Sequence, residues 1–360
     1  MSGRWLTSLG VLMIGASALT AADIPRAAAG RPDLSGTYNV ATRTPLERPK
    51  SLGDKLTLTK EEAQVIARKE AELAAKADAA TDPDRAAPEV GGSGFAGDIA
   101  VPELNFAAGE VGGYNWFWID RGEGAFQIDG TWRTSIITDP PNGRKPPLTA
   151  TAKERAAFRA KMFKPNTGTA WWVKDGLDPG PYDDPELRPM AERCLLGFGS
   201  TAGPPMLPVL YNNLKRVVQT DEHVLIFVEM VHDARIVRMN SEHEPDDVRK
   251  WMGDSIGHWD GDTLVVDTTN FTDDPALSGA SRNLHVVERF SRIDGDTLLY
   301  KFTVEDPTVW TAPWSGEYVW PTSDQRVYEY ACHEGNYSFH GIMRGARVLE
   351  SDLAGKTDDE

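Results

Sequence analysis

Apolar and polar residues alternate along much of the chain after residue 217, which is the pattern of strands with one buried face. The alternating runs cover residues 224–232, 235–239, 257–271, 284–304 and 326–332. Asp-Gly-Asp turns at 260–262 and 294–296 divide two of these runs into hairpins. We therefore expect about six antiparallel strands in this half of the chain.

The first half carries fewer periodic segments. Residues 34–40 predict a short strand, and residues 126–138 predict a hairpin that turns at Asp129 and Gly130. Thr59 with Glu62, and Thr151 with Glu154, have capping-box spacing, so we expect helices over 59–80 and 152–163. Residues 81–113 and 164–208 are rich in Gly and Pro and predict long irregular segments.

These elements predict a mainly β fold, because the helices are too few for a parallel α/β sheet. We expect an antiparallel meander that curls into a barrel or a sandwich, with the helical and loop-rich N-terminal half wrapped around it. The expected organisation is a signal peptide (1–22), a lead-in with one surface helix and a long loop (23–113), a β-barrel domain with an inserted helix and loops (114–350), and a disordered tail (351–360).

The N-terminus predicts export. Arg4 precedes an apolar run over 5–19, and Thr20 and Ala22 supply small residues for cleavage after Ala22. Cleavage after Ala29 is the alternative. The run is shorter than the ~20 residues that span a bilayer, so we expect a periplasmic or secreted protein without stable membrane insertion.

Charge and cysteine content refine this expectation. The formal net charge of −16 repels nucleic acid, so we predict no nucleic-acid partner. The partner that we expect is a small-molecule ligand or substrate, and the sequence leaves room for a homodimer. Cys194 and Cys332 either form a disulfide, as an oxidising compartment permits, or remain two buried thiols.

The segment 229–235 is the first candidate for chemistry. His232 ends an apolar row of the expected strand, and Glu229 interrupts one, with Asp233 and Arg235 beside them. A carboxylate inside a strand requires a partner, for which Arg235 and Arg289 are available. The segment is either a structural ion pair with a core histidine or the wall of a ligand cavity.

The segment 328–337 is the second candidate. Tyr330 and His333 are suitable acid–base groups, and Glu334 lies beside a Gly that predicts the end of a strand. Further residues are expected to bind a ligand through amide, hydroxyl or aromatic side chains: Tyr211, Asn212, Asn213, Asn270, Trp116 and Trp118.

The common enzyme signatures are absent from the sequence, including the nucleophile elbow, the phosphate-binding loop and the CxxC pair. No two histidines have a spacing that dictates a metal site. We therefore predict neither a metal nor a cofactor.

Several segments also resemble one large, mostly uncharacterised family of exported bacterial proteins. The matching segments are 30–36 (GRPDLSG), 133–141 (RTSIITDPP), 192–198 (ERCLLGF), 229–235 (EMVHDAR), 267–271 (DTTNF) and 330–337 (YACHEGNY). The C-terminal hairpins look like a lipocalin-type barrel, which implies a cavity for a small apolar ligand. A similarity to enzymes that cleave lignin-derived aromatic dimers bears only on the substrate class, because no catalytic motif matches.

Three hypotheses follow. The first is an exported, cofactor-independent lyase, isomerase or hydrolase that acts on a small apolar, phenolic or other aromatic molecule. In it, His232 or His333 is the general base or acid, Glu229, Asp233 or Glu334 orients the imidazole, and Tyr330 or Arg235 stabilises negative charge. The second is a non-catalytic periplasmic binding protein for an apolar ligand, and the third is an interaction domain.

Overall fold

The computed structural model describes residues 24–77, 84, 120, 122, 124–164, 167–197, 199–201 and 203–357. The expected signal peptide lies outside the described residues, as do Trp116, Trp118 and nearly all of the loop over 81–113. Within the described part, no helix has the length and apolar character needed to cross a membrane.

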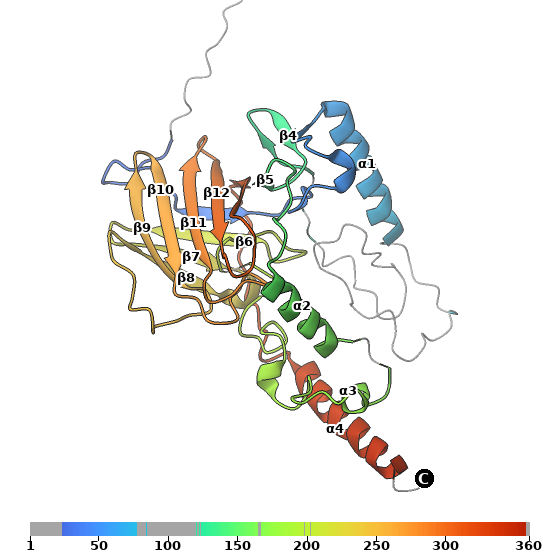
Figure 1. Ribbon diagram of the computed structural model, residues 1–360. Helices are drawn as coiled ribbons and strands as arrows, with labels where there is room; N and C mark the ends of the chain where they lie inside the picture. Colours follow the sequence, from blue (N-terminus) through green and yellow to red (C-terminus); the bar gives the residue numbers. More distant parts are fainter. Residues whose placement is uncertain are drawn as a thin grey trace, which may run out of the picture.

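A curled sheet of ten strands dominates the molecule (Figure 1). Its strand order is β1-β6-β7-β8-β9-β10-β11-β12-β13-β5, and every neighbouring pair is antiparallel except β8 and β9. The strands are β1 (Gly36–Asn39), β5 (Ile137–Asp139), β6 (Leu214–Gln219), β7 (His223–Val228), β8 (Ala234–Met239), β9 (Asp254–Asp260), β10 (Thr263–Thr269), β11 (His285–Arg292), β12 (Thr297–Glu305) and β13 (Trp314–Pro321).

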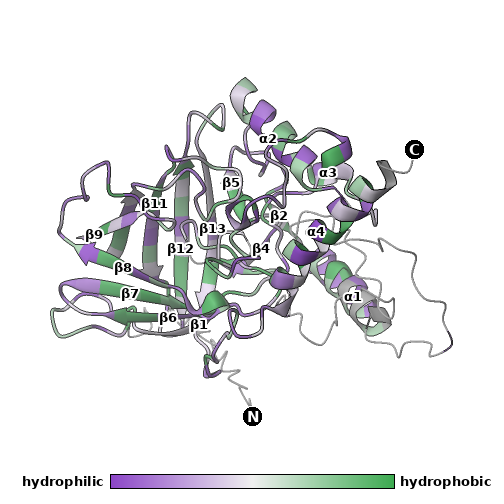
Figure 2. Cartoon of the chain, turned by 90° about the horizontal axis from the view of Figure 1, so that it is seen from below, coloured by the Kyte–Doolittle hydropathy of each residue, from purple (hydrophilic) through white to green (hydrophobic). Residues whose placement is uncertain are grey.

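The curl stops short of a closed barrel. It brings β1 back beside β13, where a single isolated bridge joins Tyr38 to Thr322. The sheet is therefore a half-barrel with β1 and β5 at its edges, and the expected closed lipocalin-type barrel is not observed. Strands β6–β8 lie across from β11–β13, so both layers bury their inner faces against each other (Figure 2).

Successive side chains of a strand point to opposite faces of the sheet, and this alternation explains which of them fill the half-barrel. Along β13, Trp314, Tyr318 and Trp320 point inward and are fully buried. Tyr300 of β12 and Phe290 of β11 pack on Trp320 with ring centroids 5.0 and 5.5 Å away. Strand β13 was not among the predicted strands, although its alternation of buried and exposed positions is regular.

Two of the predicted hairpins are confirmed, and two strand predictions are wrong. The Asp-Gly-Asp turns join β9 to β10 and β11 to β12 as expected. Residues 326–332 form no strand, and β7 ends at Val228 instead of continuing to His232. A 3-10 turn, η4 (Met230–His232), follows with positive φ angles of 59° at Val231 and 47° at His232. These angles end the strand pattern, because β-strands require negative φ.

The smaller elements lie outside the half-barrel. The predicted hairpin turn at Asp129 and Gly130 is confirmed, but its strands belong to a separate three-stranded sheet. That sheet has the order β2-β4-β3, with β2 (Thr57–Leu58), β3 (Gln127–Ile128) and β4 (Thr131–Arg133). The short 3-10 turns are η1 (Lys50–Leu52) and η3 (Pro185–Leu187).

The helices are α1 (Lys60–Ala77), α2 (Ala150–Met162), α3 (Trp171–Lys174) and α4 (Tyr337–Thr357). The Thr59–Glu62 capping box is confirmed by reciprocal hydrogen bonds of 2.9 and 3.2 Å. The box at Thr151 is wrong, because Thr149 caps α2. Among the described residues up to 113, α1 is the one α-helix, so a helical N-terminal half is not observed.

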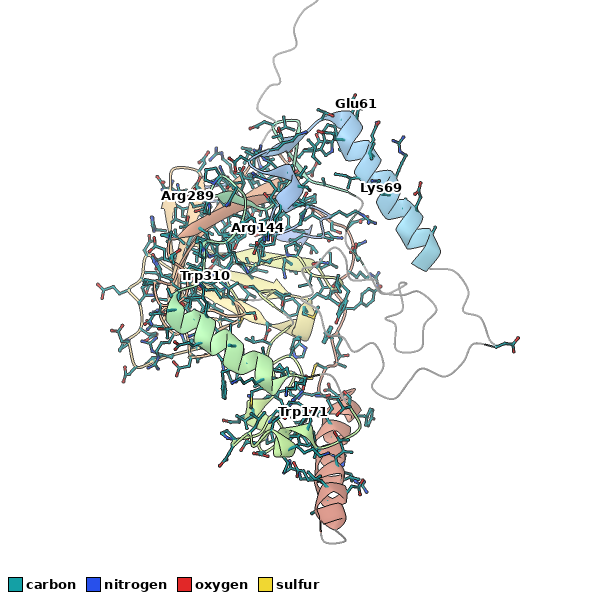
Figure 3. All side chains as sticks on the ribbon, turned by 45° about the vertical axis from the view of Figure 1, so that its right-hand side comes forward. Glu61, Lys69, Arg144, Trp171, Arg289 and Trp310 are labelled. Carbon is teal, nitrogen blue, oxygen red and sulfur yellow. A yellow bond between two sulfur atoms is a disulfide. The ribbon has the colours of Figure 1, made fainter. Side chains whose placement is uncertain are left out.

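Helix α4 is the largest element that the sequence did not predict. It projects from the sheet beside α3 and covers residues 351–357, which were expected to be disordered (Figure 1). Ala346 packs against Trp171 and Trp172, and the Trp172 indole donates to Glu350 at 2.8 Å. Trp171, the first residue of α3, is labelled in Figure 3, where it lies beside α4. A disulfide joins Cys194 to Cys332, which confirms the bridged alternative.

Candidate functional site

A large cleft lies where the two parallel strands separate. Strands β8 and β9 pair only through Val237–Met239 and Ser255–Gly257. Before this pairing the strands diverge, and a cleft of about 910 Å³ opens between the start of β8, residues 249–254 and residues 195–196. We call it the splay cleft. Asp233 and Arg235 line it, together with Arg238, Arg249, Lys250 and Asp254.

A buried ion pair lies on the inner face of the sheet beside the cleft. Arg235 of β8 donates to both carboxylate oxygens of Glu288 on β11, at 2.5 and 3.0 Å, and both side chains are almost fully buried. The Tyr300 hydroxyl donates to Glu288 at 2.7 Å and accepts from the Met206 backbone N–H at 2.9 Å. Burial is the main cause, and the Glu288 charge the second, that raises the pKa of Tyr300 well above its ordinary value. This inner ion pair joins the two layers of the half-barrel.

Asp233 and Lys215 form a second pair of charged residues beside the cleft. The Val228 N–H donates to the Asp233 carbonyl, and Lys215 lies opposite Val228, so the three residues are neighbours across three chain segments. Lys215 is fully buried, and its Nζ donates to the Thr201 carbonyl at 2.6 Å. Burial lowers the pKa of Lys215 to about 7, although Asp233 and Glu229 oppose this effect.

Asp233 differs from the other carboxylates around the cleft in its lack of partners. Its Oδ2 atom is buried and has no hydrogen-bond partner among the described residues. Burial raises the pKa of Asp233 to about 6, while the charges of His232 and Lys215 act in the opposite direction. Arg235 Nε and Thr201 Oγ1 are also buried without a partner in the described part of the chain. A carboxyl group with such a pKa can exchange protons near neutral pH.

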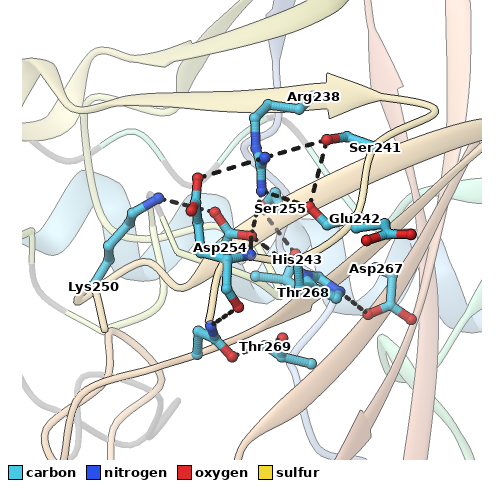
Figure 4. A network of polar contacts seen from close by, with 12 residues as sticks. Arg238, Ser241, Glu242, His243, Lys250, Asp254, Ser255, Asp267, Thr268 and Thr269 are labelled. Carbon is cyan, nitrogen blue, oxygen red and sulfur yellow. Dashed lines mark hydrogen bonds and ion pairs between the residues drawn. The ribbon is translucent and has the colours of Figure 1, made fainter. Parts of the chain in front are cut away.

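The outer face of the sheet carries a chain of alternating carboxylates and imidazoles, and Figure 4 shows its first part, from Asp254 through His243 to Asp267. Asp254 contacts His243 at 3.2 Å, His243 contacts Asp267 at 3.0 Å, and Asp267 contacts His285 at 3.0 Å. His285 continues to Glu305 at 3.6 Å. This outer chain fixes the segment before β9, which forms one wall of the splay cleft, to strands β10, β11 and β12.

Asp254 is the most heavily bonded member of the outer chain. It accepts from Arg238 at 2.7 Å, Lys250 at 2.9 Å and the Glu244 N–H at 3.1 Å, in addition to the contact with His243. Burial alone would raise its pKa, but the hydrogen bonds from Lys250, the Glu244 N–H and His243 lower it to about 2. Similarly, burial of Asp267 is outweighed by His285 and His243, so its pKa is lowered. The hydrogen bond to Asp267 raises the pKa of His285.

The structure brings the two predicted clusters together, but through backbone atoms. Glu229 Oε1 accepts from the Tyr328 N–H at 3.1 Å, and His232 Nδ1 lies 3.0 Å from the Tyr330 carbonyl. The expected partners of Glu229 are wrong, because Arg235 pairs with Glu288 and Arg289 pairs with Asp260 at 2.6 Å. Figure 3 labels Arg289 on the outside of the sheet.

The second cluster is separate from the splay cleft. His333 and Glu334 are exposed in the turn before α4. Tyr330 lines a smaller cleft of about 480 Å³ around the Cys194–Cys332 bridge. Since residues 326–332 are not a strand, the expected alternation of Tyr330 and His333 across a sheet is wrong.

The residues expected to bind a ligand mostly hold loops in place. Asn213 is buried and bonds to Val209 and to the Asp120 carbonyl. Asn270 donates to the carbonyls of Glu244 and Pro245 at 2.9 and 3.1 Å. Asn212 and Asn270 both have positive φ, which asparagine tolerates. Tyr211 packs against the cluster of Val228, Met230 and Val231.

Sequence reasoning missed Lys215, Glu288, Asp254 and His243. A usable signal existed for two of them. Lys215 precedes the inward Val217 by two positions, and Glu288 lies between the inward Val286 and Phe290, so alternation alone directs both charges inward. No comparable signal marks His243, because it lies in an irregular segment.

Comparison with known proteins does not assign the chain to a family. No protein-family model matches the chain, and no curated protein matches it. The described residues contain no group of three or more His, Cys, Asp or Glu side chains placed to hold a metal ion. The functional argument therefore depends on the geometry of the splay cleft.

Proposed function

We propose that the protein is an exported, cofactor-independent enzyme that uses carboxylate acid–base chemistry on a small molecule in the splay cleft. The observation that carries the proposal is Asp233. Its side chain lines the cleft, one oxygen is buried without a partner among the described residues, and its pKa is about 6. Perturbed carboxyl groups in clefts are typical of general acids and bases.

Each neighbouring group has a role in this proposal. Asp233 removes a proton from a carbon next to a carbonyl group. The electron pair of the broken C–H bond forms a C=C bond, and the π pair of the carbonyl moves to its oxygen. Lys250, which lines the cleft and is half-exposed, stabilises the resulting oxyanion, whereas Arg235 is buried against Glu288. Return of the proton to another position completes an isomerisation, and loss of a leaving group completes an elimination.

The role of His232 is revised accordingly. Its imidazole bonds to the Tyr330 carbonyl, which positions the ring beside Asp233, where its charge lowers the pKa of that carboxyl. We assign it a positioning role. His333, exposed in its turn, has no part in this site.

Hydrogen–deuterium exchange tests the reaction class without a known substrate. A panel of phenolic and non-phenolic aryl ketones is incubated with the protein in D₂O, and the α-proton signals are followed by NMR. We expect enzyme-dependent exchange for at least one compound and its loss in Asp233→Asn. Asp221→Asn, at an exposed position in the turn before β7, is the matched control and should retain exchange. Equal exchange in the wild type and Asp233→Asn, or none with any ketone, would contradict the proposal.

A binding protein is the second candidate. The observation in its favour is apolar exposure at the cleft, where Ile236 and Trp251 line the wall and leave 57% and 42% of their surfaces accessible. Ligand binding without exchange or turnover would favour this function.

The Cys194–Cys332 disulfide supports export, because such bonds persist in oxidising compartments. Cell fractionation of the full chain and of a form lacking residues 1–22 tests this part. We expect only the full chain to reach the periplasm or medium.

A further inference from the structure

Arg249 is the cation of the splay cleft that no acidic side chain neutralises among the described residues. Its Nη1 donates to the backbone carbonyls of Phe271 and Arg282, at 3.1 and 3.0 Å. These carbonyls fix the guanidinium in place but carry no net charge. The nearby Arg282 side chain has its own partner, Asp273, at 2.9 Å.

The other cations at the cleft all have acidic partners. Arg238 and Lys250 both contact Asp254, at 2.7 and 2.9 Å, and Arg238 also lies 3.5 Å from Glu244. Arg235 pairs with Glu288. Arg249 is therefore the cleft cation whose charge an external anion would neutralise.

The positive charge of Arg249 is opposite in sign to the net charge of the whole chain, which is −16. A positive site in an acidic protein favours an anion at that place alone, since the remaining surface repels anions. A planar guanidinium fits a carboxylate, with which it forms paired hydrogen bonds. One guanidinium without an acidic partner matches a monoanion better than a phosphate dianion.

The apolar part of the cleft defines the rest of the ligand. Trp251 and Ile236 are both more than one-third exposed and line the same cleft as Arg249. An exposed indole offers a flat face for stacking, and its neighbours Leu195 and Leu196 extend the apolar wall. The volume of about 910 Å³ lies within the range of small-molecule sites, roughly 300–1,000 Å³.

We infer that the splay cleft binds a small aromatic carboxylate, with its ring against Trp251 and Ile236 and its carboxylate on Arg249. The inference rests on the proposed function only in taking this cleft as the functional site. It specifies the substrate class as a monoanionic aromatic acid.

A comparison of two isosteric probes tests the inference. Benzoate and benzamide have the same ring and nearly the same shape, but only benzoate is charged. Calorimetric titration at low ionic strength should show that the wild type binds benzoate at least about tenfold more tightly than benzamide, the scale of one charged hydrogen bond. Added salt should weaken benzoate binding and leave benzamide binding unchanged.

Three variants test whether Arg249 is the positive charge that binds the carboxylate. Arg249→Gln should bring the two affinities to within about twofold, while Arg289→Gln, on the outer surface of β11, should retain the preference. Arg249→Lys keeps the charge and should keep part of the preference, which guards against a loss that reflects folding. Equal affinities for the two probes in the wild type, or an unchanged preference in Arg249→Gln, would overturn the inference.

The outcome is separable from that of the proposed function. Arg249-dependent preference for benzoate without deuterium exchange of any ketone retains this inference and rejects the enzyme. Asp233-dependent exchange of neutral ketones without a preference for benzoate retains the enzyme and rejects the inference.

Discussion

Asp233 and Asp254 both line the splay cleft, yet their surroundings act on the two carboxylates in opposite directions. Asp254, with 2% of its side chain exposed, accepts from Arg238, Lys250, the Glu244 N–H and His243, and its pKa is about 2. Asp233 has an oxygen without a partner among the described residues, and its pKa is about 6. Burial raises the pKa in both cases, so the number of donors decides the difference.

The comparison separates a residue that holds the fold from one available for chemistry. Ionisation of Asp254 strengthens the outer chain and fixes the cleft wall. Ionisation of Asp233 leaves a desolvated charge beside the cleft, which destabilises the folded state. The following predictions test this contrast, from the largest expected effect to the smallest.

The inner ion pair should give the largest loss of stability. Glu288→Gln leaves Arg235 buried without its counter-charge, and we expect the free energy of unfolding to fall by about 3–5 kcal/mol. Urea denaturation measures the change. Asp260→Asn breaks an exposed pair with Arg289 and should leave stability nearly unchanged, because solvent screens this pair. Similar losses in the two variants would show that burial does not distinguish these pairs.

Asp254→Asn should have the next largest effect. It keeps the shape of the side chain but removes the charge that several donors share, so we expect a loss of about 1.5–3 kcal/mol in the free energy of unfolding. The wild-type contribution should be present above pH 4 and disappear as the pH falls toward 2, because the folded pKa is lowered. A loss in the variant that does not change with pH would contradict the charged role of Asp254.

Asp233→Asn should have the opposite sign. A raised folded pKa means that the carboxyl destabilises the fold once it ionises, so this effect is absent below pH 4 and complete above pH 6. We expect the variant to be more stable than the wild type at pH 7.5 by about 1–2 kcal/mol, and equally stable at pH 4. Paired denaturation curves at the two pH values measure the difference. A variant less stable at pH 7.5 would show that Asp233 has a stabilising partner.

His285→Gln should have the smallest effect, about 0.5–1 kcal/mol, because the pair with Asp267 is one-third exposed. The folded pKa of His285 is raised, so its contribution is complete below pH 6.5 and is lost as the pH rises through the folded pKa. The wild type should therefore exceed the variant more at pH 5.5 than at pH 8.5. A larger difference at pH 8.5 would reverse the assigned sign.

Local signals predicted the parts of the fold that depend on neighbouring residues. The Asp-Gly turns and the Thr59 capping box are formed by residues a few positions apart, and they were predicted correctly. The positive φ at Val231 and His232 depends on packing around η4, and no local residue type indicated it. The apolar face of helix α4 packs against Trp171 and Trp172, which are distant in the sequence.

The candidate site was predicted only in part, because it too combines local signals with contacts between distant segments. Asp233 and Arg235 were identified from their strand, and both line the cleft. Arg249 and Asp254 reach it from the segment 249–254, and Glu288 pairs with Arg235 from β11. The alternation of a single strand does not reveal which strands will be neighbours. The parallel pairing of β8 with β9, which creates the cleft, is a tertiary feature that the antiparallel prediction did not include.

The bridge between Cys194 and Cys332 closes a covalent ring that contains strands β6 to β13. Any single backbone cut inside this ring therefore leaves one connected molecule. Nicks made by an extracellular protease in the loop over 240–253, for example, would leave both fragments attached. Such a nicked protein should migrate as one band without reductant and as two bands with it.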